Sequence, residues 1–299
     1  MSTHIARRIS PAFPIGLALL LIVAVVLTIR LGNPLGRATG IDRFTHSVQC
    51  DRLTLASTEA HPHLDHIAEW AATYVRAIST ELGIPEVPVT VRLLINKRSF
   101  VHYGSDHILG FNRNMDFCYY PSDRCVYGYF MRIYDLRPRL QHELLHAVLH
   151  ASRSRLPLWF EEGLAELSED FEFDHNGVRL EGIQRRRMQL ARRHAARDTL
   201  PDPTQLGQLG PRRFYGRDAT LNYSAAYSLV LFLHQQQRLL YSLRSGSATL
   251  DQEQYKRFVI EPAAWDQPQP VQTATTDVDL AGPRRIWVVD TGVLGNASY

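Results

Sequence analysis

The sequence predicts an α+β protein, with strands in the first half of the chain and helices filling the second half. Two observations lead to this prediction. Alternating, β-rich stretches cluster between residues 87 and 134, and helix-period apolar patterns dominate from residue 138 onward. The chain has 299 residues, of which 45% are hydrophobic, so it can bury a sizeable core in one large domain or two small ones.

The composition excludes several classes of protein. The chain carries 33 basic and 30 acidic residues, a net charge of +3, and this balance gives no reason to expect a nucleic-acid partner. Three cysteines are too few for a small disulfide-dense domain, and 16 prolines with 18 glycines are too few for a fibrous chain. We therefore expect a globular protein that binds no nucleic acid.

An apolar run near the N-terminus predicts a membrane-spanning helix. The 21 residues between Arg8 and Arg30 carry no charge, and as a helix they would measure about 30 Å, the thickness of the hydrocarbon core of a bilayer. We therefore expect a short basic flank at residues 1–10, a transmembrane signal anchor at residues 11–31 and a stalk or entry segment at residues 32–60. A cleaved signal peptide is the alternative, although no A-x-A cleavage site follows the run.

Residues 61–260 form the predicted folded domain. Its first helix is expected over His61–Leu82, where apolar residues recur on one face and Gly83 ends the pattern. Strands are expected where the composition is β-rich and alternates between apolar and polar residues. These stretches are Val87–Ile95, Ile108–Tyr119 and Val126–Tyr134.

Helices dominate the second half of this domain. Pro138 opens the first of them, because proline is favoured in the first turn of a helix. Apolar periodicity predicts four helices, over Pro138–Ser152, Leu158–Phe171, Arg179–Arg197 and Leu221–Leu243. The remaining residues, 261–299, are rich in Pro, Gln and Thr and are expected to form a loosely structured tail, in which Ile286–Val289 could add a strand.

Two of the three cysteines point to a compartment. Cys118 and Cys125 bracket a short loop with Pro and Asp turn residues, and two strands joined there would bring the sulfurs close enough for a disulfide. A disulfide needs an oxidising compartment, so this pattern and the apolar run predict a single-pass membrane protein. Its domain would lie outside the cytoplasm, on the periplasmic side of a bacterial inner membrane. The alternatives are two free thiols and a domain that faces the cytoplasm. Cys50 is assigned no role.

The candidate catalytic residues begin with His142-Glu143-Leu144-Leu145-His146, which matches the pattern H-E-x-x-H within a predicted helix. Imidazoles at positions i and i+4 face the same way, about 6 Å apart along the axis, and can bind one Zn²⁺. Glu143 then lies beside the open position of the metal, where it can act as a general base. The alternative is a helix with incidental histidines, and a third ligand decides between the two.

A second motif follows in the next predicted helix, with the sequence Trp159-Phe160-Glu161-Glu162-Gly163-Leu164-Ala165-Glu166. Together with H-E-x-x-H it resembles the active-site helices of the gluzincin zinc metallopeptidases, the thermolysin and M1-aminopeptidase group, and most of all their peptidase-MA-like members. The resemblance implies a zincin-like fold and Glu162 as the third zinc ligand. It also implies that Glu166 accepts a hydrogen bond from a zinc-bound imidazole, whereas Glu161 is assigned no role. Fifteen residues separate His146 from Glu162, fewer than in M1 aminopeptidases, which implies a shortened connection.

The resemblance extends to the start of the long apolar helix. Tyr223 matches a tyrosine that hydrogen-bonds the transition state in M1-type gluzincins; Tyr227 is the alternative, and a packing role for the ring of Tyr223 stays open. The G-x-M-E-N stretch with which M1 aminopeptidases hold a free amino terminus is absent from the sequence, which favours an endopeptidase. The predicted strand Val126–Tyr134 is expected to be the edge along which an extended peptide pairs.

The sequence as a whole predicts a membrane-anchored zinc metallopeptidase, attached to the membrane by its N-terminal helix, that hydrolyses bonds in a peptide or protein substrate. His142, His146 and Glu162 would hold Zn²⁺, Glu143 would act as the general base, and Tyr223 would support the oxyanion. A non-catalytic zincin-fold binding or scaffold protein of the cell envelope is the alternative, because it would carry the same residue types.

Overall fold

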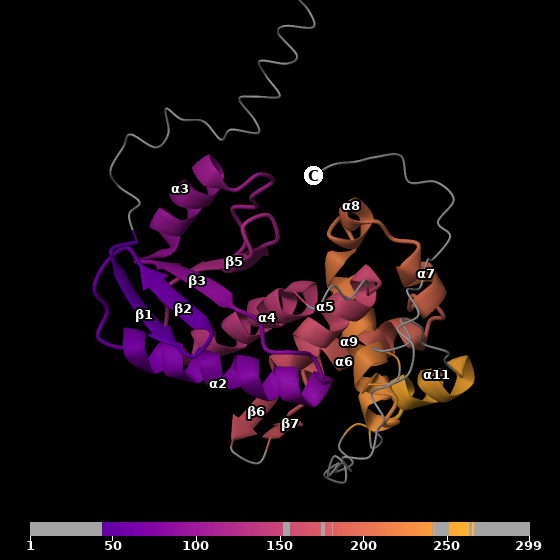
Figure 1. Ribbon diagram of the computed structural model, residues 1–299. Coiled ribbons are helices and arrows are strands. Elements are labelled where there is room, and N and C mark those ends of the chain that lie inside the picture. The colour runs from indigo at the N-terminus through magenta and orange to yellow at the C-terminus, as the bar shows by residue number, and fades with distance from the viewer. Residues whose placement is uncertain are drawn as a thin grey trace, which may run out of the picture.

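The chain has an α+β fold, as the sequence predicts (Figure 1). The structure is a computed structural model that describes residues 44–151, 156–174, 177–180, 182–240, 242, 251–262 and 265. A five-stranded sheet with helices on both of its faces forms one half, and a group of helices forms the other. The two halves meet at α4 (Ile133–Ala151) and α5 (Leu158–Ser168), the helices that carry the two motifs.

The sheet combines parallel inner strands with antiparallel edges. Strands β2, β3 and β5 run parallel, and β1 and β4 pair antiparallel with β2 and β5. The spatial order is β1 (His46–Cys50), β2 (Leu53–Ser57), β3 (Val89–Leu94), β5 (Cys125–Tyr129) and β4 (Cys118–Tyr120). Strands β1 and β2 fall within residues 32–60, the expected stalk, so this part of that segment belongs to the sheet. Strand β5 is an inner strand, so the expectation that it forms the substrate edge is wrong, and β4 is the edge strand.

Two apolar cores lie on the two faces of the sheet. Helices α2 (Leu64–Leu82) and α4 cover one face, and α3 (Lys97–His107) covers the other (Figure 1). Because side chains alternate along a strand, Val126 packs in the core beneath α2 and α4, whereas its neighbours Cys125 and Tyr127 pack in the core beneath α3. At β5, both faces of the sheet are therefore covered.

Several elements differ from the sequence prediction at their ends. Helix α4 begins before Pro138, so this proline lies inside the helix. The stretch expected as a strand at Ile108–Tyr119 contributes only β4, and α3 precedes it with an Asn96 side chain that accepts the Ser99 N–H at 3.0 Å. The β6–β7 hairpin (Phe171–Asp174 and Gly177–Leu180) lies mainly between two predicted helices and takes Phe171 from the end of one and Arg179 and Leu180 from the start of the other. Local pairing overrides helical periodicity at these ends.

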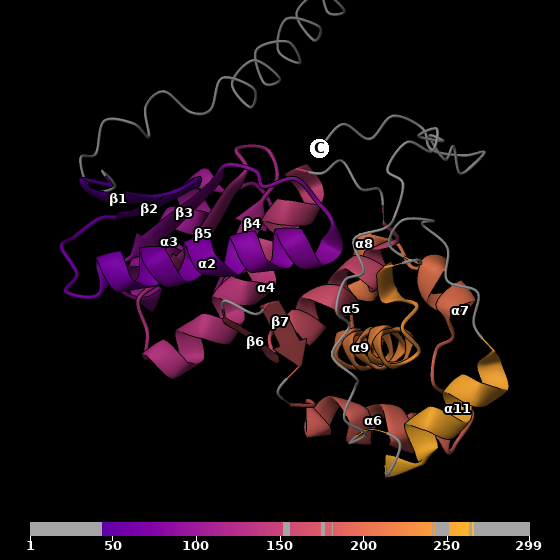
Figure 2. The same ribbon diagram turned by 60° about the horizontal axis from the view of Figure 1, so that its bottom comes forward.

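The helical half is arranged around α9 (Ala219–Gln235), which Figure 2 shows nearly end-on. Every residue from Ser224 to Leu233 is buried, which is typical of a helix surrounded by others. The helices that contact it, besides α5, are α6 (Arg185–Ala195), α7 (Pro203–Gly207), α8 (Pro211–Phe214) and α11 (Gln252–Ile260). From the expected tail, Trp265 is buried and donates from Nε1 to the carbonyl oxygen of Phe258 at 2.8 Å. The strand expected at 286–289 lies outside the described residues.

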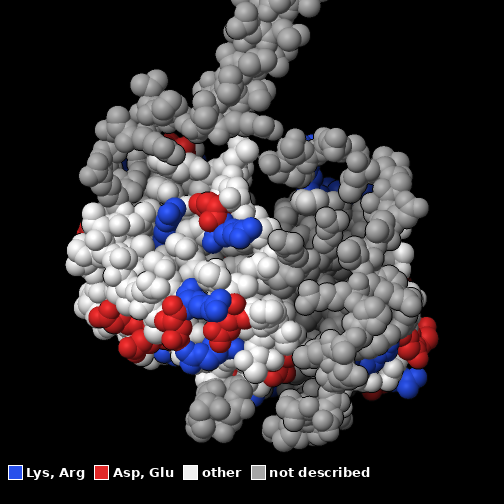
Figure 3. Space-filling model, in the orientation of Figure 1, with Lys and Arg blue, Asp and Glu red and all other residues white. Residues whose placement is uncertain are grey.

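The localisation expected from the sequence needs correction. Across the part of the chain that the structure describes, no helix combines the length and the apolar character required to cross a membrane. This finding contradicts the prediction of a single-pass membrane protein with an extracytoplasmic domain. The segment on which that prediction rested, residues 11–31, lies outside the described residues. On the face shown in Figure 3, acidic and basic side chains lie next to one another around α2, in keeping with the balanced composition.

The predicted disulfide is also not formed. Cys118 and Cys125 are both buried free cysteines. The register explains this, because Cys118 lies opposite Tyr127 and Cys125 lies opposite Tyr120. The two cysteines are therefore diagonal neighbours, with Cα atoms about 7–8 Å apart in an ordinary antiparallel pair, beyond the range that a disulfide bridges.

Candidate metal centre

Helix α4 places the H-E-x-x-H motif at the boundary between the two halves of the molecule. Its apolar side chains, including Leu140, Leu144 and Val148, are fully buried and fix the rotation of the helix. His142 and His146, one turn apart, then face the same way with ring centroids 5.0 Å apart. Their side chains are only 13% and 11% exposed. The local periodicity of a helix is therefore sufficient to bring these two imidazoles together.

Helix α5 supplies the third group. The Oε2 atom of Glu162 lies 3.6 Å from Nε2 of His142, and its Oε1 atom lies 3.7 Å from Nε2 of His146. One ligand atom from each of the three residues lies within 4.8 Å of the other two. Donors that share a zinc ion at 2.0–2.2 Å in a tetrahedron stand about 3.3–3.6 Å apart. The spacing and the donor types, two imidazoles and one carboxylate, therefore fit a zinc ion with one open position.

Gly163 explains how α9 reaches this centre. A Cβ atom at Gly163 would lie 2.5 Å from the carbonyl oxygen of Ala226, which is too close for any side chain. The absence of a side chain thus lets the backbones of α5 and α9 touch, directly beside Glu162. This close approach brings the first turns of α9, with Tyr223, to the metal centre.

A carboxylate contacts each of the two imidazoles at Nδ1, the ring nitrogen that does not face Glu162. Glu169 lies 3.0 Å from Nδ1 of His142, and Glu161 lies 3.0 Å from Nδ1 of His146. A carboxylate at Nδ1 fixes the proton on that nitrogen and leaves Nε2 as the donor to a metal. Neither of these two carboxylates was assigned from the sequence. The available signal was the density of acidic residues in the otherwise apolar segment 161–170.

The structure places Glu166 differently from the role that the resemblance implies. Both of its oxygens accept hydrogen bonds from Arg187, at 2.7 Å from Nε and 2.6 Å from Nη2. Its side chain is only 5% exposed. Burial and the neighbouring Glu169 raise the pKa of Glu166, and the charge of Arg187 opposes this rise. Glu166 therefore anchors Arg187 from α6. One of its oxygens also lies within 4.8 Å of an imidazole nitrogen of His142, whereas Glu169 is the carboxylate that contacts Nδ1 of His142, at 3.0 Å.

Electrostatics keep Glu162, the third candidate ligand, ionised. Burial by itself raises the pKa of Glu162, but the charge of His146 and a hydrogen bond from His142 outweigh burial and lower it to about 2. Burial lowers the pKa of His142, whereas its contacts with Glu162 and Glu169 raise it well above its usual value. The site thus has a strong net attraction for positive charge.

Glu143 faces the edge of the sheet. Its Oε2 atom accepts the backbone N–H of Tyr119, on β4, at 2.6 Å. This hydrogen bond connects the edge strand with α4 and fixes the orientation of the carboxylate. The hydroxyl of Tyr119 lies 2.9 Å from Nδ1 of His150, which gives the same strand a second contact with α4.

Three tyrosines lie around the centre, with different partners. Tyr227 donates from its hydroxyl to Asp170 and accepts the N–H of Gln184, both at 2.9 Å, so it is engaged away from Glu162. Tyr223 lies beside the site, where burial, the charges of Glu162, Glu166 and Glu143 and a hydrogen bond with Glu162 raise its pKa. Its ring lies beneath the guanidinium of Arg187, 5.2 Å from the centroid.

Tyr215, the third tyrosine, was not identified from the sequence. Its hydroxyl donates to Oε1 of Glu162 at 2.5 Å. It follows the short helix α8, 53 positions after Glu162, and no periodicity or motif connects the two.

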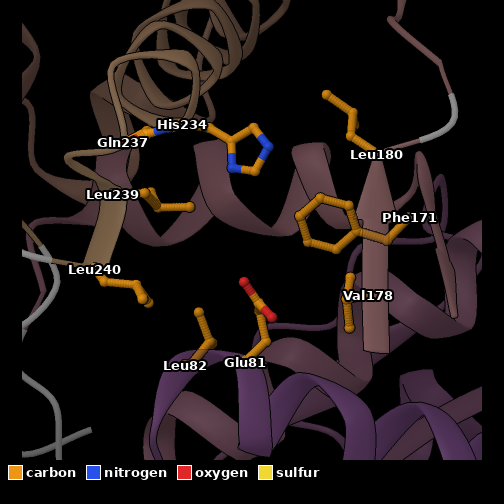
Figure 4. A pocket seen from close by; sticks show the side chains of 9 residues that line it. All are labelled: Glu81, Leu82, Phe171, Val178, Leu180, His234, Gln237, Leu239 and Leu240. Carbon is orange, nitrogen blue, oxygen red and sulfur yellow. The ribbon is translucent and has the colours of Figure 1, made fainter. Parts of the chain in front are cut away.

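A separate small cavity lies away from these residues (Figure 4). The imidazole of His234 and the carboxylate of Glu81 point into it, and the rest of its lining is mainly apolar. The other lining residues are Leu82, Phe171, Val178, Leu180, Gln237, Leu239 and Leu240. None of the three candidate ligands lines this cavity, so it forms no part of the metal centre.

Comparison with known proteins adds no assignment to this geometry: no model of a protein family matches the chain, and neither does any curated protein.

Proposed function

We propose that this chain is a zinc-dependent metallopeptidase with a zincin-like fold, and that it acts as an endopeptidase. The observation that carries the proposal is the convergence of His142, His146 and Glu162, with ligand atoms within 4.8 Å of one another, close to Glu143, whose charge acts on both histidines. The order of the motifs supports it as well, because H-E-x-x-H followed by E-G-x-x-E resembles the gluzincin metallopeptidases.

In this proposal His142, His146 and Glu162 hold the zinc ion. When bound, zinc acts as a Lewis acid towards a carbonyl group and lowers the pKa of water. Glu161 and Glu169 keep the two imidazoles in the tautomer that presents Nε2. These carboxylates act before any substrate arrives, because they set the geometry of the ligands.

Glu143 transfers the proton in the proposed reaction. The N–H of Tyr119 engages Oε2 of this carboxylate, and its other oxygen then takes a proton from the attacking water and delivers it to the leaving amine. Tyr223 donates a hydrogen bond to the oxygen of the scissile carbonyl as negative charge develops on it. The position of Tyr223 beneath Arg187 restricts the ring, which limits the entropy lost in forming this contact.

Metal content and hydrolysis test the proposal separately. The full chain is assayed for bound metal by mass spectrometry and for cleavage of a library of internally quenched peptides. We expect one zinc per chain, and cleavage within peptides whose termini are blocked. Glu143→Gln should keep the zinc and lose at least about 100-fold in kcat/KM, because it lacks the general base. Glu253→Gln, which alters an exposed carboxylate on α11, is the matched control.

Each of the other possible outcomes contradicts one part of the proposed function. Zinc at unit stoichiometry without cleavage of any peptide would favour the non-catalytic scaffold. Two histidines and one carboxylate also bind Fe(II) in oxygenases, so iron in place of zinc would refute the assignment of the metal. Undiminished cleavage by the Glu143→Gln variant would refute the mechanism.

A further inference from the structure

Tyr215 connects the surface of the molecule with the metal centre. The residue is 48% exposed, yet its hydroxyl donates to Oε1 of Glu162, a side chain that is only 6% exposed. The hydrogen bond is 2.5 Å long. A phenol at this distance from a carboxylate makes a strong, charge-assisted bond, so it has a marked effect on how the carboxylate is held.

The backbone on both sides of Tyr215 is held in place. Phe214, immediately before it, is fully buried, and its carbonyl oxygen accepts a hydrogen bond from Nδ2 of Asn222 at 2.9 Å. Gly216, immediately after it, lies so close to the carbonyl oxygen of Arg212 that a Cβ atom would be 2.8 Å away. The hydrogen bond from Asn222 attaches the end of α8 to α9, and Gly216 lets the chain turn tightly against α8 itself, so the point from which the phenol reaches Glu162 is fixed.

The carboxylate of Glu162 needs such a contact. Its two oxygens face different imidazoles, Oε1 at 3.7 Å from His146 and Oε2 at 3.6 Å from His142. The terminal torsion of a glutamate has broad minima, so the rotamer alone does not fix the plane of the carboxylate. A hydrogen bond to Oε1 fixes that plane and leaves Oε2 free to bind a metal as a single ligand.

We propose that Tyr215 is a positioning residue for the third metal ligand: by its hydrogen bond to Oε1 it fixes the carboxylate of Glu162 in the orientation that binds zinc, and it makes the α8 segment part of the metal centre. This inference rests on the proposed metal site, but it does not depend on peptide hydrolysis. It gives Tyr215 a role distinct from that of Tyr223. Tyr223, 6.3 Å from Tyr215 between ring centroids, also contacts the carboxylate of Glu162, but its ring lies beneath Arg187 and we assign its hydroxyl to the reaction.

A matched pair of variants, Tyr215→Phe and Tyr223→Phe, tests the assignment, because each loses one hydroxyl and keeps its ring. Zinc affinity is measured by competition with a chromogenic chelator, and circular dichroism verifies that each metal-free variant is folded. The cobalt-loaded proteins are compared by visible absorption, which reports the geometry of the ligands. Peptide hydrolysis is measured at saturating zinc.

We expect Tyr215→Phe to bind zinc about 10- to 100-fold more weakly, the usual effect of losing a group that orients a metal ligand. Its cobalt spectrum should change, and much of its kcat should remain at saturating zinc. Tyr223→Phe also removes a contact with Glu162, but it should lose less zinc affinity than Tyr215→Phe does, and it should lose kcat at saturating zinc. A purely structural role for Tyr215 would lower stability without changing the cobalt spectrum.

Zinc affinity of Tyr215→Phe within twofold of wild type would overturn the inference, and so would an equal loss of affinity in both variants. A wild-type chain that binds zinc but cleaves no peptide would refute the proposed hydrolysis and leave the comparison of affinities intact. A wild-type chain that binds neither zinc nor cobalt would overturn this inference together with the metal site.

Discussion

Replacement of Gly163 by alanine should separate the helix that carries Glu162 from the helix that carries Tyr223. The new Cβ atom would lie 2.5 Å from the carbonyl oxygen of Ala226 and 2.8 Å from Cγ2 of Val230. A carbon atom rarely approaches an oxygen closer than about 3.3 Å, so α5 and α9 must move apart by about 0.8 Å. The oxygen belongs to the backbone of a buried helix, and no change of side-chain rotamer can relieve the contact.

The magnitudes predict a small loss of stability and a large loss of activity. Extra volume in a packed core costs about 1–3 kcal/mol, and alanine recovers about 1 kcal/mol relative to glycine inside a helix. The free energy of unfolding should therefore fall by roughly 0–2 kcal/mol. A displacement of nearly 1 Å at the site, by contrast, can cost about 100-fold in kcat. We expect Gly163→Ala to remain folded and to bind zinc, but to hydrolyse peptides about 100-fold more slowly.

Urea unfolding, zinc content and steady-state kinetics measure these three quantities. Gly207→Ala is the matched control, because a Cβ atom on Gly207 would meet only Nε1 of Trp159, at an ordinary 3.9 Å. This control should keep full activity. Full activity together with unchanged stability in Gly163→Ala would refute the reasoning, since it would mean that the two helices do not touch at this point.

Two further predictions concern buried charge. Arg187→Met leaves the buried carboxylate of Glu166 without its partner and should lower the free energy of unfolding in urea by roughly 3 kcal/mol. The double variant Arg187→Met, Glu166→Gln should recover most of this loss. A double variant as unstable as Arg187→Met alone would show that the ion pair is unimportant for stability. Burial raises the pKa of Asp170 to about 6, although a hydrogen bond from Tyr227 opposes the rise. Between about pH 4 and pH 6 this carboxyl is ionised only in the unfolded chain, so the folded state binds the extra proton and loses stability as the pH rises. Asp170→Asn lacks the titrating carboxyl, so between about pH 4 and pH 6 its free energy of unfolding should rise relative to that of the wild type, by up to roughly 3 kcal/mol. The measurement is urea unfolding of the metal-free proteins as a function of pH. Parallel pH profiles of the two proteins would contradict the raised pKa of Asp170.

The residues that the sequence identifies at the site are those that local geometry brings together. His142 and His146 converge because of the helical repeat alone, and Glu162 was found through a motif that resembles a known one. Tyr215 and Arg187 come from α8 and α6, and the folding of the helical half brings them to Glu162 and Glu166. Such contacts depend on tertiary packing, which leaves no periodic signal in the sequence.

The same distinction applies to the fold. Helix α2 and strand β3 were predicted because a long amphipathic face and a clean alternation are local signals. Strand β1 has mostly exposed or half-buried residues, so its sequence carries little apolar pattern, and its place is set by pairing with β2. Helix α3 buries few residues, among them Phe100 and Tyr103, and its clearest local signal is the Asn96 cap.

The position of α9 has a consequence for how changes at a distance reach Tyr223. From Ser224 to Leu233 every residue of the helix is buried. Its side chains are closely packed, so they cannot change rotamer to accommodate a shift of a neighbouring helix. On its far side, Phe232 packs against the rings of Tyr255 and Phe258 of α11, at 5.7 Å and 5.3 Å between centroids. A substitution at this contact would therefore displace α9 as a rigid unit. Tyr223, near the opposite end of the helix and more than two turns away, would move with it.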